Sequence, residues 1–364
     1  MIFNRKTCVD NGGGIMRQIH SEVVEFRGSH YDYGMMQGNA LKESITLHNR
    51  RGQWKSKRPR FVIDPAEAQA AFNAYAPKLW EELKGLEDSL KLPIDEVLRD
   101  FGGYRIDAPP SGCSIVSGED FLVRNYDFHP QTYEGRFCLF QPDEGNAIIG
   151  PSQRILGRMD GMNEHGLVMG YNFMHRKNPG DGFVCYMIGR IILESCSTVD
   201  EAVALVEDIP HRGSFSYVVT DKRGVTKVIE ATPRKVAVRD ASVCTNHFEI
   251  QQQENRNYLK DSYDRLSVIE RNAEDAAEAY RAYRLFNDTG RGLFSDLYKS
   301  WAGTIHTSVY LPKEGEVWFA LGGDQEPEVF NFGEWLAGKP VRTKSVHGQI
   351  DTGIGFAHTD SLFK

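Results

Sequence analysis

The 364-residue sequence lacks the features that mark several common classes of protein. No stretch approaches the roughly 18 uncharged apolar residues that a bilayer-spanning helix needs, so we expect no membrane span. Met1–Gly14 holds Arg5, Lys6 and Asp10 but no apolar run long enough for a secretory signal, which favours a cytoplasmic protein. The net charge of -7 and the lack of a sustained basic run argue against a general nucleic-acid or anionic-membrane binder.

Cysteine is scarce and dispersed. The six cysteines include no CxxC pair, which excludes the common zinc and redox spacings and does not resemble a disulfide framework. No cluster of His, Asp and Glu has convincing metal-ligand spacing, and Gly12-Gly13-Gly14 lacks the Lys-Ser/Thr of a P-loop, so we expect neither metal nor cofactor. Cys138, Cys185 and Cys196 lie among apolar neighbours and are expected to be buried, whereas Cys113 has different surroundings.

The order of predicted elements indicates an α+β fold. After a short strand at Glu22–Phe26, residues 1–112 are expected to be largely helical, and residues 113–364 largely β with inserted helices. The expected strands form two groups along the chain, and so do the expected helices. This order predicts two sheets packed face to face, with helices on their outer faces. The expected helices include one opened by the capping box Asp64-Pro65-Ala66-Glu67, one at 197–206 and one at 261–285.

The most informative stretch joins Gly112-Cys113 to Arg124-Asn125-Tyr126-Asp127-Phe128. The turn residues Ser117–Asp120 between two apolar runs predict a β-hairpin whose second strand returns Arg124 and Asp127 beside the sulfur. A neighbouring cation and carboxylate are how a thiol becomes a nucleophile near neutral pH. The preceding Ala108–Gly112 is rich in Pro and Gly, as a strained, cleavable linker would be, but an ordinary interdomain loop has the same composition.

Cleavage of the Gly112–Cys113 bond would free an α-amino group, with a reference pKa of about 7.7–8.0, which can act as the base for the same residue's thiol. Amide chemistry also needs donors for the oxyanion. Asn246, just after a predicted strand, could donate to it or be a turn residue. Asn172, which follows Tyr171 at a strand end, could bind substrate or offer its backbone N–H.

Three further residue groups leave alternatives open. Arg265, near the start of a predicted helix, either points inward or faces solvent. Asp160–Leu167 is typical of a tight turn between strands. A Cys–His protease pair is an alternative to a self-processed cysteine, with His247 as its best candidate.

Taken together, these residues resemble the N-terminal-nucleophile hydrolases. The match is closest to the acyl-CoA:6-aminopenicillanate acyltransferase-like branch, which is related to choloylglycine hydrolases and penicillin V acylases. The motifs that carry the resemblance, in the family's order, are Val24–Gly34 with Gln37-Gly38, Gly112-Cys113, Arg124–Phe128, Gly161–Leu167, Thr245–Phe248 and Ser262–Arg265.

The resemblance implies a four-layer αββα sandwich over residues 113–364, with the mainly helical pro-segment 1–112 retained as a bound subunit after cleavage. It makes Cys113 the nucleophile, freed when its thiol attacks the Gly112 carbonyl and the thioester hydrolyses. The remaining roles that it implies are orientation of the thiol and amino terminus by Arg124 and Asp127, an oxyanion hole from Asn246 and the neighbourhood of Tyr171 and Asn172, and support of the site by Arg265.

The expected function is that of a cysteine amidohydrolase that cleaves a linear, non-peptide C–N amide bond through a Cys113 acyl-enzyme. Two alternatives remain, an acyl-CoA-dependent N-acyltransferase of the same family and a catalytically inactive, ligand-binding member. The expected partner is a small-molecule amide or acyl compound, or an acyl-CoA in the transferase alternative. The acyl and amine specificity stay open, as does the oligomeric state, a homo-oligomer included.

Overall fold

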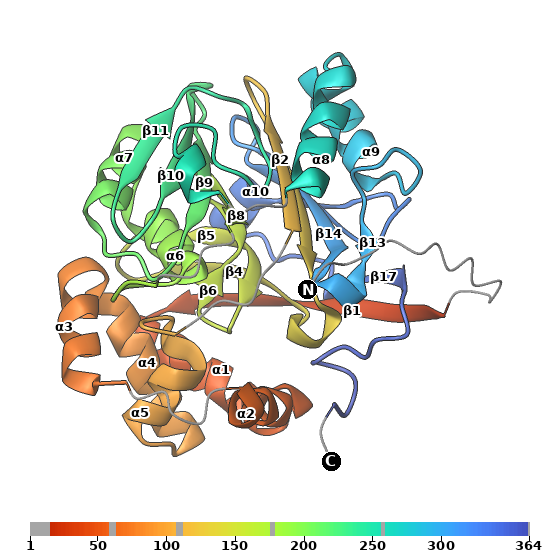
Figure 1. Ribbon diagram of the computed structural model, residues 1–364. Helices are drawn as coiled ribbons and strands as arrows, with labels where there is room; N and C mark the ends of the chain where they lie inside the picture. The colour runs from red at the N-terminus through yellow and green to blue at the C-terminus, as the bar shows by residue number, and fades with distance from the viewer. Residues whose placement is uncertain (1–14, 58–62, 107–111, 175–178, 256–258, 363–364) are drawn as a thin grey trace.

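The computed structural model describes residues 15–57, 63–106, 112–174, 179–255 and 259–362, with no side-chain detail for 53–57. Within these ranges the chain forms two β-sheets with helices around them (Figure 1). The larger sheet has the strand order β11-β10-β9-β8-β7-β5-β4-β1-β17, with β6 paired to β5. Its strands are β1 (Met16–Gly28), β4 (Arg136–Pro142), β5 (Ile148–Gln153), β6 (Gly157–Arg158), β7 (Asp160–Asn163), β8 (Val168–Phe173), β9 (Phe215–Thr220), β10 (Thr226–Ala231), β11 (Val236–Arg239) and β17 (Ser345–Asp351).

The smaller sheet carries the cysteine hairpin. Its order is β12-β2-β3-β14-β15-β16, with β13 paired to β14. All of its described pairings are antiparallel, as expected for strands joined by short turns. Its strands are β2 (Gly112–Ser117), β3 (Leu122–Phe128), β12 (Val243–Cys244), β13 (Asp296–Leu297), β14 (Ala302–Leu311), β15 (Glu316–Leu321) and β16 (Glu328–Asn331).

Nine of the ten α-helices in the described residues fall into three groups, and the short α10 packs against β15. The first group, α1 to α5, gathers at one end of the sheets, at the bottom of Figure 1. Helices α6 and α7 cover the larger sheet, and α8 and α9 cover the smaller one. The helix bounds are α1 (His30–Lys42), α2 (Ile45–Lys57), α3 (Pro65–Tyr75), α4 (Pro77–Leu90), α5 (Ile94–Val97), α6 (Cys185–Ser195), α7 (Val199–Asp208), α8 (Lys260–Arg271), α9 (Ala279–Asn287) and α10 (Phe332–Leu336).

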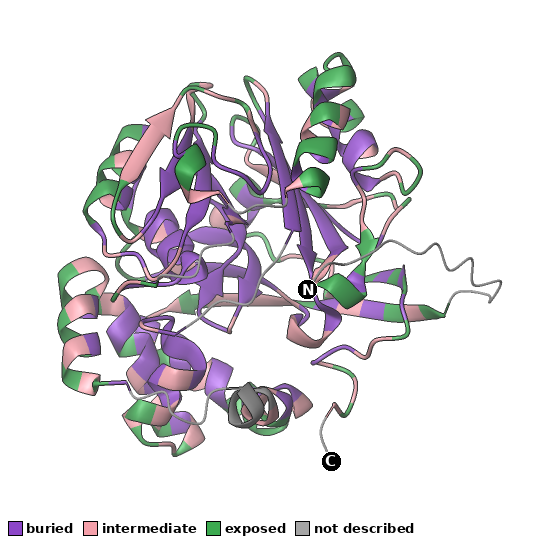
Figure 2. Cartoon of the chain, in the orientation of Figure 1, coloured by how far each residue is buried: buried purple, intermediate pink, exposed green. Residues whose placement is uncertain are grey.

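The layering is therefore helix, sheet, sheet, helix, and the predicted α+β fold is confirmed. One large apolar cluster includes residues of both sheets, so the main core lies between them, where Figure 2 shows buried strands. Ile115 of β2 and Val168 of β8 both belong to this cluster and are fully buried. Sheet-on-sheet packing places the cysteine strand in the interior of the molecule.

Local capping explains several element boundaries. The Asp64 side chain accepts hydrogen bonds from the N–H groups of Ala66 (2.9 Å) and Glu67 (3.3 Å), which confirms the predicted start of α3. The single helix predicted over 261–285 is wrong, because the chain forms α8 and α9 instead. Asn272 ends α8 by donating its side-chain amide to the Val268 carbonyl at 2.7 Å, and Glu278 caps the start of α9.

The first part of the chain shares the larger sheet with the rest. Strand β1 pairs in parallel with β4 and antiparallel with β17 and is thus an interior strand of that sheet. It is longer than the Glu22–Phe26 strand expected from the sequence, because the polar ends of the segment also pair. The five helices that follow fit the largely helical character expected before residue 112. The division at 112 stays a prediction.

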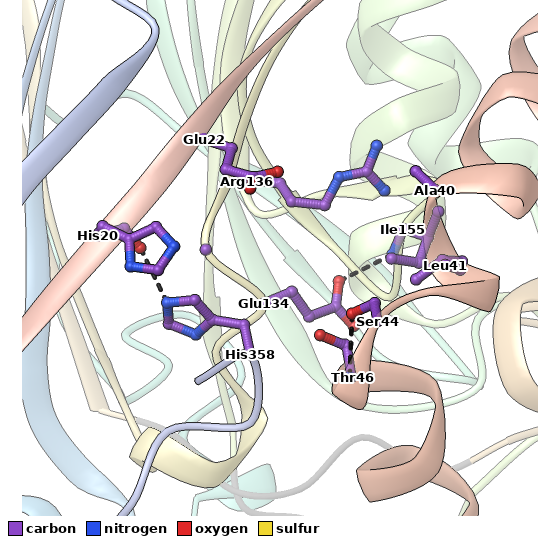
Figure 3. A pocket seen from close by; sticks show the side chains of 11 residues that line it. His20, Glu22, Ala40, Leu41, Ser44, Thr46, Glu134, Arg136, Ile155 and His358 are labelled. Atoms are coloured by element: carbon purple, nitrogen blue, oxygen red, sulfur yellow. Dashed lines mark hydrogen bonds between the residues drawn. The ribbon is translucent and has the colours of Figure 1, made fainter. Parts of the chain in front are cut away.

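A cavity of about 90 Å³ lies where β1, the start of α2 and the C-terminal residues meet. His20, Thr46, Glu134 and His358 are among its lining residues (Figure 3). The His358 ring nitrogen Nε2 lies 2.9 Å from the His20 carbonyl oxygen, and Glu134 accepts a 2.9 Å hydrogen bond from the Ile155 N–H. None of the residues predicted for the cysteine site lines this cavity.

Candidate active site

Cys113 lies on β2 at the centre of a polar cluster. The β2–β3 register places Cys113 opposite Tyr126, Gly112 opposite Asp127 and Ile115 opposite Arg124, which confirms the predicted hairpin. The Cys113 side chain is fully buried in the continuous chain. Burial raises the pKa of its thiol, and the positive charge of Arg124 partly opposes that rise.

Side chains from other elements satisfy the main chain of Cys113. Within the described residues, strand β12 pairs with β2 only at Ile115 and Val116, and no strand covers this edge of β2 at Cys113. The Cys113 N–H instead donates to Asn246 Oδ1 at 2.7 Å. Its carbonyl accepts a 2.5 Å hydrogen bond from Arg265 Nη1. The N–H and the carbonyl of Cys113 are thus held by an amide and a guanidinium rather than by a strand.

Arg265 and Asn246 form one connected unit. Arg265 Nη2 donates to Asn246 Oδ1 at 2.8 Å, and Asn246 Nδ2 donates to the Phe173 carbonyl at 2.9 Å. Arg265 projects inward from α8, because its side chain is only 4% exposed, and it pairs at 3.0 Å with Asp261. Of the two alternatives for Arg265, the structure therefore has the inward one. Asn246 Oδ1 accepts at Cys113, and the Phe173 carbonyl takes one of the two Nδ2 hydrogens.

Arg124 contacts the sulfur directly. Its Nη2 lies 3.3 Å from Cys113 Sγ and donates to the Tyr171 carbonyl at 2.6 Å. Its Nη1 pairs with Asp160 at 3.1 Å, and both side chains are fully buried. Although burial lowers the pKa of the Arg124 guanidinium, Cys113 and Asp160 raise it more, so Arg124 stays charged. Gly170 makes room for it, since a Cβ there would lie 3.1 Å from Arg124 Cδ.

Asp127 is a buried carboxyl whose two oxygens differ in their hydrogen bonding. Its Oδ1 accepts a 2.6 Å hydrogen bond from the Thr304 hydroxyl, and the described residues offer no hydrogen-bond partner to its buried Oδ2. Burial raises the pKa of Asp127 to about 7, against the lowering by Arg265 and Thr304. The same Oδ2 lies 3.6 Å from the position that a Cβ on Gly112 would take. Near neutral pH this carboxyl can accept or give up a proton beside the Gly112–Cys113 bond.

Asn172 and Tyr171 of β8 bond to groups near Cys113, and their expected role toward substrate or oxyanion stays a prediction. The Asn172 side-chain amide donates to the carbonyls of Cys244 (2.9 Å) and Thr245 (3.2 Å), so it holds the segment that carries Asn246. That bonding leaves Asn172 Nδ2 no free hydrogen aimed at an oxyanion. Tyr171 contributes its carbonyl, and its ring lies 5.1 Å from the Arg124 guanidinium carbon.

His247 faces a different set of partners. Its Nδ1 lies 2.8 Å from Ser262 Oγ and 3.2 Å from Thr245 Oγ1, and its ring packs 4.1 Å from Tyr263. Burial, Arg239 and Arg265 lower the pKa of His247 to about 4, so the imidazole is neutral at physiological pH. No hydrogen bond between His247 and Cys113 occurs in the described part of the chain, which disfavours a Cys–His pair.

Sequence reasoning missed the residues that hold the predicted ones. Asp160 anchors Arg124 and accepts a 3.1 Å hydrogen bond from the Tyr310 hydroxyl, while Thr304 anchors Asp127. Asp160 is the first residue of the segment expected to be a turn, and no role at the site was expected for it. Thr304 gave no signal, because one threonine in a strand is ordinary. Within the described ranges, no group of three His, Cys, Asp or Glu side chains is placed to hold a metal ion.

Comparison with known proteins gives one family match. The model of the acyl-coenzyme A:6-aminopenicillanic acid acyl-transferase family matches residues 116–326, more than half of the chain. That range contains Arg124, Asp127, Asn246 and Arg265 and begins just after Cys113. No curated protein sequence matches the chain.

Similar solved structures include three of low sequence identity. Penicillin V acylase from Agrobacterium tumefaciens is 14% identical over 60% of this chain and 84% of that chain, with a TM-score of 0.40. A mutant of conjugated bile acid hydrolase from Clostridium perfringens is 15% identical over 61% and 93%, with a TM-score of 0.38. A Caenorhabditis elegans ortholog of N-acylethanolamine-hydrolyzing acid amidase is 12% identical over 56% and 93%, with a TM-score of 0.36. In the described part of the chain, no helix has the length and apolar character to cross a bilayer.

Proposed function

This chain belongs to the acyl-coenzyme A:6-aminopenicillanic acid acyl-transferase family, and from that premise we propose that it is a self-processing thiol amidohydrolase. Its nucleophile is Cys113, and its substrate is a small molecule with a linear amide bond. The observation that carries the proposal is that a different side chain contacts each of the three polar groups of Cys113. The N–H is held by Asn246, the carbonyl by Arg265 and the thiol by Arg124. A structural cysteine in a strand needs none of these.

Self-cleavage is the first step of the proposal. The Cys113 sulfur attacks the Gly112 carbonyl carbon and forms an S–C bond, and the thiol proton passes to Asp127. The C–N bond then breaks, and the nitrogen takes a proton to become the α-amino group of Cys113. Water hydrolyses the resulting thioester, which leaves a carboxylate on Gly112 and a free thiol. The unpartnered Asp127 Oδ2 beside Gly112 supports the proton transfer.

Turnover repeats the same chemistry on an external amide. The freed α-amino group, with an ordinary pKa of about 7.7–8.0, acts as the base for its own thiol. Asn246 Oδ1 is already placed to hold that nitrogen, since it accepts from the same atom in the continuous chain. Arg124 stabilises the thiolate at 3.3 Å. The sulfur takes the acyl group, the amine leaves with a proton, and water releases the acid.

The first 112 residues are proposed to stay bound after cleavage. Arg190 of α6 donates to Glu82 of α4 at 2.9 Å and pairs with Glu194 at 2.6 Å, and both Arg190 and Glu82 are fully buried. Separation would break the buried Arg190–Glu82 pair and leave the Glu82 carboxylate without this cation. Strand β1 would also have to leave the middle of the larger sheet. The covalent link at Gly112 is thus one of several attachments.

Acyl transfer is the second candidate, and the family description favours it directly. In that reaction an acyl-CoA thioester loads Cys113, and an amine rather than water takes the acyl group. The two functions share the acyl-enzyme and differ only in the acceptor. Incubating the cleaved protein with phenylacetyl-CoA, with and without a primary amine, separates them: a transferase makes amide faster than acid, and a hydrolase makes acid in both cases.

The intact mass of the denatured protein tests self-processing. Wild type is expected to give two fragments that divide between Gly112 and Cys113, and Cys113→Ala a single chain. Cys113→Ser serves as the matched control, because a hydroxyl keeps the attack possible and slows it. A wild-type protein that stays intact after prolonged incubation at pH 7 to 8 contradicts the proposal. A Cys113→Ala variant that is still cut there would mean that another protease does the cutting.

A further inference from the structure

We propose that Ala302 is a specificity-determining residue that restricts the acyl group to one without a substituent on one side of its α-carbon. This inference rests on the proposed function, because it concerns the acyl group bonded to Cys113. It concerns the shape of the acyl site, because the side of the α-carbon that faces Ala302 has no room for a substituent. For α-methyl acids it adds a preference for one enantiomer.

The pro-segment that ends at Gly112 is chemically the first acyl substrate of the site. Self-cleavage passes through a thioester in which the Gly112 carbonyl carbon is bonded to Cys113 Sγ. Turnover passes through a thioester in which the substrate's acyl carbon is bonded to the same sulfur. The two intermediates share the sulfur, the carbonyl and the α-carbon, so the Gly112 α-carbon marks where a substrate's α-carbon lies. The surroundings of Gly112 therefore report on the acyl site.

The space around that α-carbon is closed on one side. A Cβ added to Gly112 would lie 3.2 Å from the Ala302 Cβ, closer than ordinary carbon–carbon contact, and 3.6 Å from the Asp127 Cβ. Gly112 is not among the glycines with a left-handed φ, so its backbone alone does not require glycine. The restriction comes from Ala302, the half-buried first residue of β14. Figure 1 shows β14 in the same sheet as β2.

The closed side defines a handedness. The blocked position is the one that an L-residue's Cβ would occupy. In a 2-phenylpropionyl group, with the phenyl in place of the Gly112 nitrogen, that position is taken by the methyl of the R enantiomer. The S enantiomer directs its methyl to the other hydrogen of the α-carbon. The site is therefore expected to accept phenylacetyl groups, to accept (S)-2-phenylpropionyl groups more slowly, and to discriminate most strongly against the R form.

The first test uses no external substrate. We expect Gly112→Ala to slow self-cleavage about tenfold or more, because overpacking disfavours the reacting geometry. The double variant Gly112→Ala/Ala302→Gly is expected to regain most of that loss, since removal of the Ala302 Cβ opens the space. Time courses of intact mass at fixed pH give the rates. Melting temperatures measured in a Cys113→Ala background separate slow cleavage from failure to fold.

The second test uses the cleaved protein and three p-nitrophenyl esters, of phenylacetic acid and of (R)- and (S)-2-phenylpropionic acid. The expected result is acylation of Cys113 by the phenylacetyl ester, a slower S ester and a still slower R ester. Ala302→Gly is expected to bring the acylation rates of the two enantiomers closer together, so that the ratio of the S rate to the R rate falls several-fold. That ratio would not move if Ala302 only supported the fold, because both esters would then slow together.

The outcomes separate the inference from the proposed function. If wild type cleaves itself and is acylated, yet the double variant gains nothing over Gly112→Ala and both enantiomers react equally, the inference about Ala302 is wrong and the proposed function stands. If wild type neither cleaves itself nor is acylated by any ester, the proposed function fails and the inference fails with it. Rescue by Ala302→Gly in both tests supports the inference.

Discussion

The raised pKa of Asp127 gives a measurable pH dependence of folding. An ordinary aspartate has a pKa of about 3.9, whereas burial raises that of Asp127 to about 7. Between about pH 3.9 and about pH 7, Asp127 is therefore protonated in the folded state and ionised in the unfolded state. The stability that the protonated group contributes is present at low pH and is lost as pH rises through about 7.

Asp127→Asn removes this dependence, because an amide does not titrate. Each pH unit in the interval is worth about 1.4 kcal/mol, so from pH 5 to pH 8 the variant is expected to gain about 3 kcal/mol over the parent protein. The measurement is urea unfolding at several pH values, with Cys113→Ala as the parent so that the chain stays whole. Asp264→Asn is the control, since this exposed side chain pairs with Lys260 and is expected to change stability by less than about 1 kcal/mol at every pH. A stability difference between Asp127→Asn and its parent that does not change with pH would refute the reasoning.

Three other variants test separate parts of the account. Arg190→Met leaves two buried glutamates without their partner and should lower the free energy of unfolding by about 3–5 kcal/mol, measured by urea denaturation; an unchanged midpoint would show that the network does not matter. Thr304→Val removes the hydroxyl that donates to Asp127, so the pKa of Asp127 in the folded state should rise further, and the pH at which the stability gain of Asp127→Asn levels off should rise with it. His247→Ala should still self-cleave within a few-fold of the wild-type rate by intact mass, because the imidazole is neutral and bonded elsewhere; loss of cleavage would restore the pairing with Cys113 as the mechanism.

The sequence predicted best where local signals agree. The hairpin around Cys113 follows from two apolar runs and a polar turn, and the α3 start follows from Asp64 and Pro65, whose effects reach only neighbouring residues. The helix predicted over 261–285 failed because helical periodicity continues through a break that one side chain, Asn272, creates. Helix α6 was not predicted, since its almost wholly apolar and buried sequence lacks the alternation of an exposed helix.

The sequence indicated which residues lie together near Cys113, but not which hydrogen bonds they make. Its residues come from strands, a loop and a helix far apart in the sequence, and chain order alone does not say which atom meets which. The hydrogen bonds of Asn246 were not predicted: its Oδ1 accepts from Cys113 and Arg265, and one Nδ2 hydrogen goes to the Phe173 carbonyl. Its donation to an oxyanion stays a prediction. The Asn172 side chain likewise bonds to the Cys244 carbonyl, a contact that chain order does not predict. Partners such as Asp160 are set by sheet-to-sheet packing, which a single sequence does not encode in any short motif.

The central claim is that the thiol of Cys113, once freed, carries the acyl group of an amide or ester. The most direct test is the intact mass of the C-terminal fragment after rapid acid quenching of a reaction with p-nitrophenyl phenylacetate, followed by peptide mapping. The account predicts one added phenylacetyl group, located on the peptide that begins at Cys113 and lost when the reaction runs to completion. An unmodified fragment during active turnover, or an acyl group on any other residue, would contradict it.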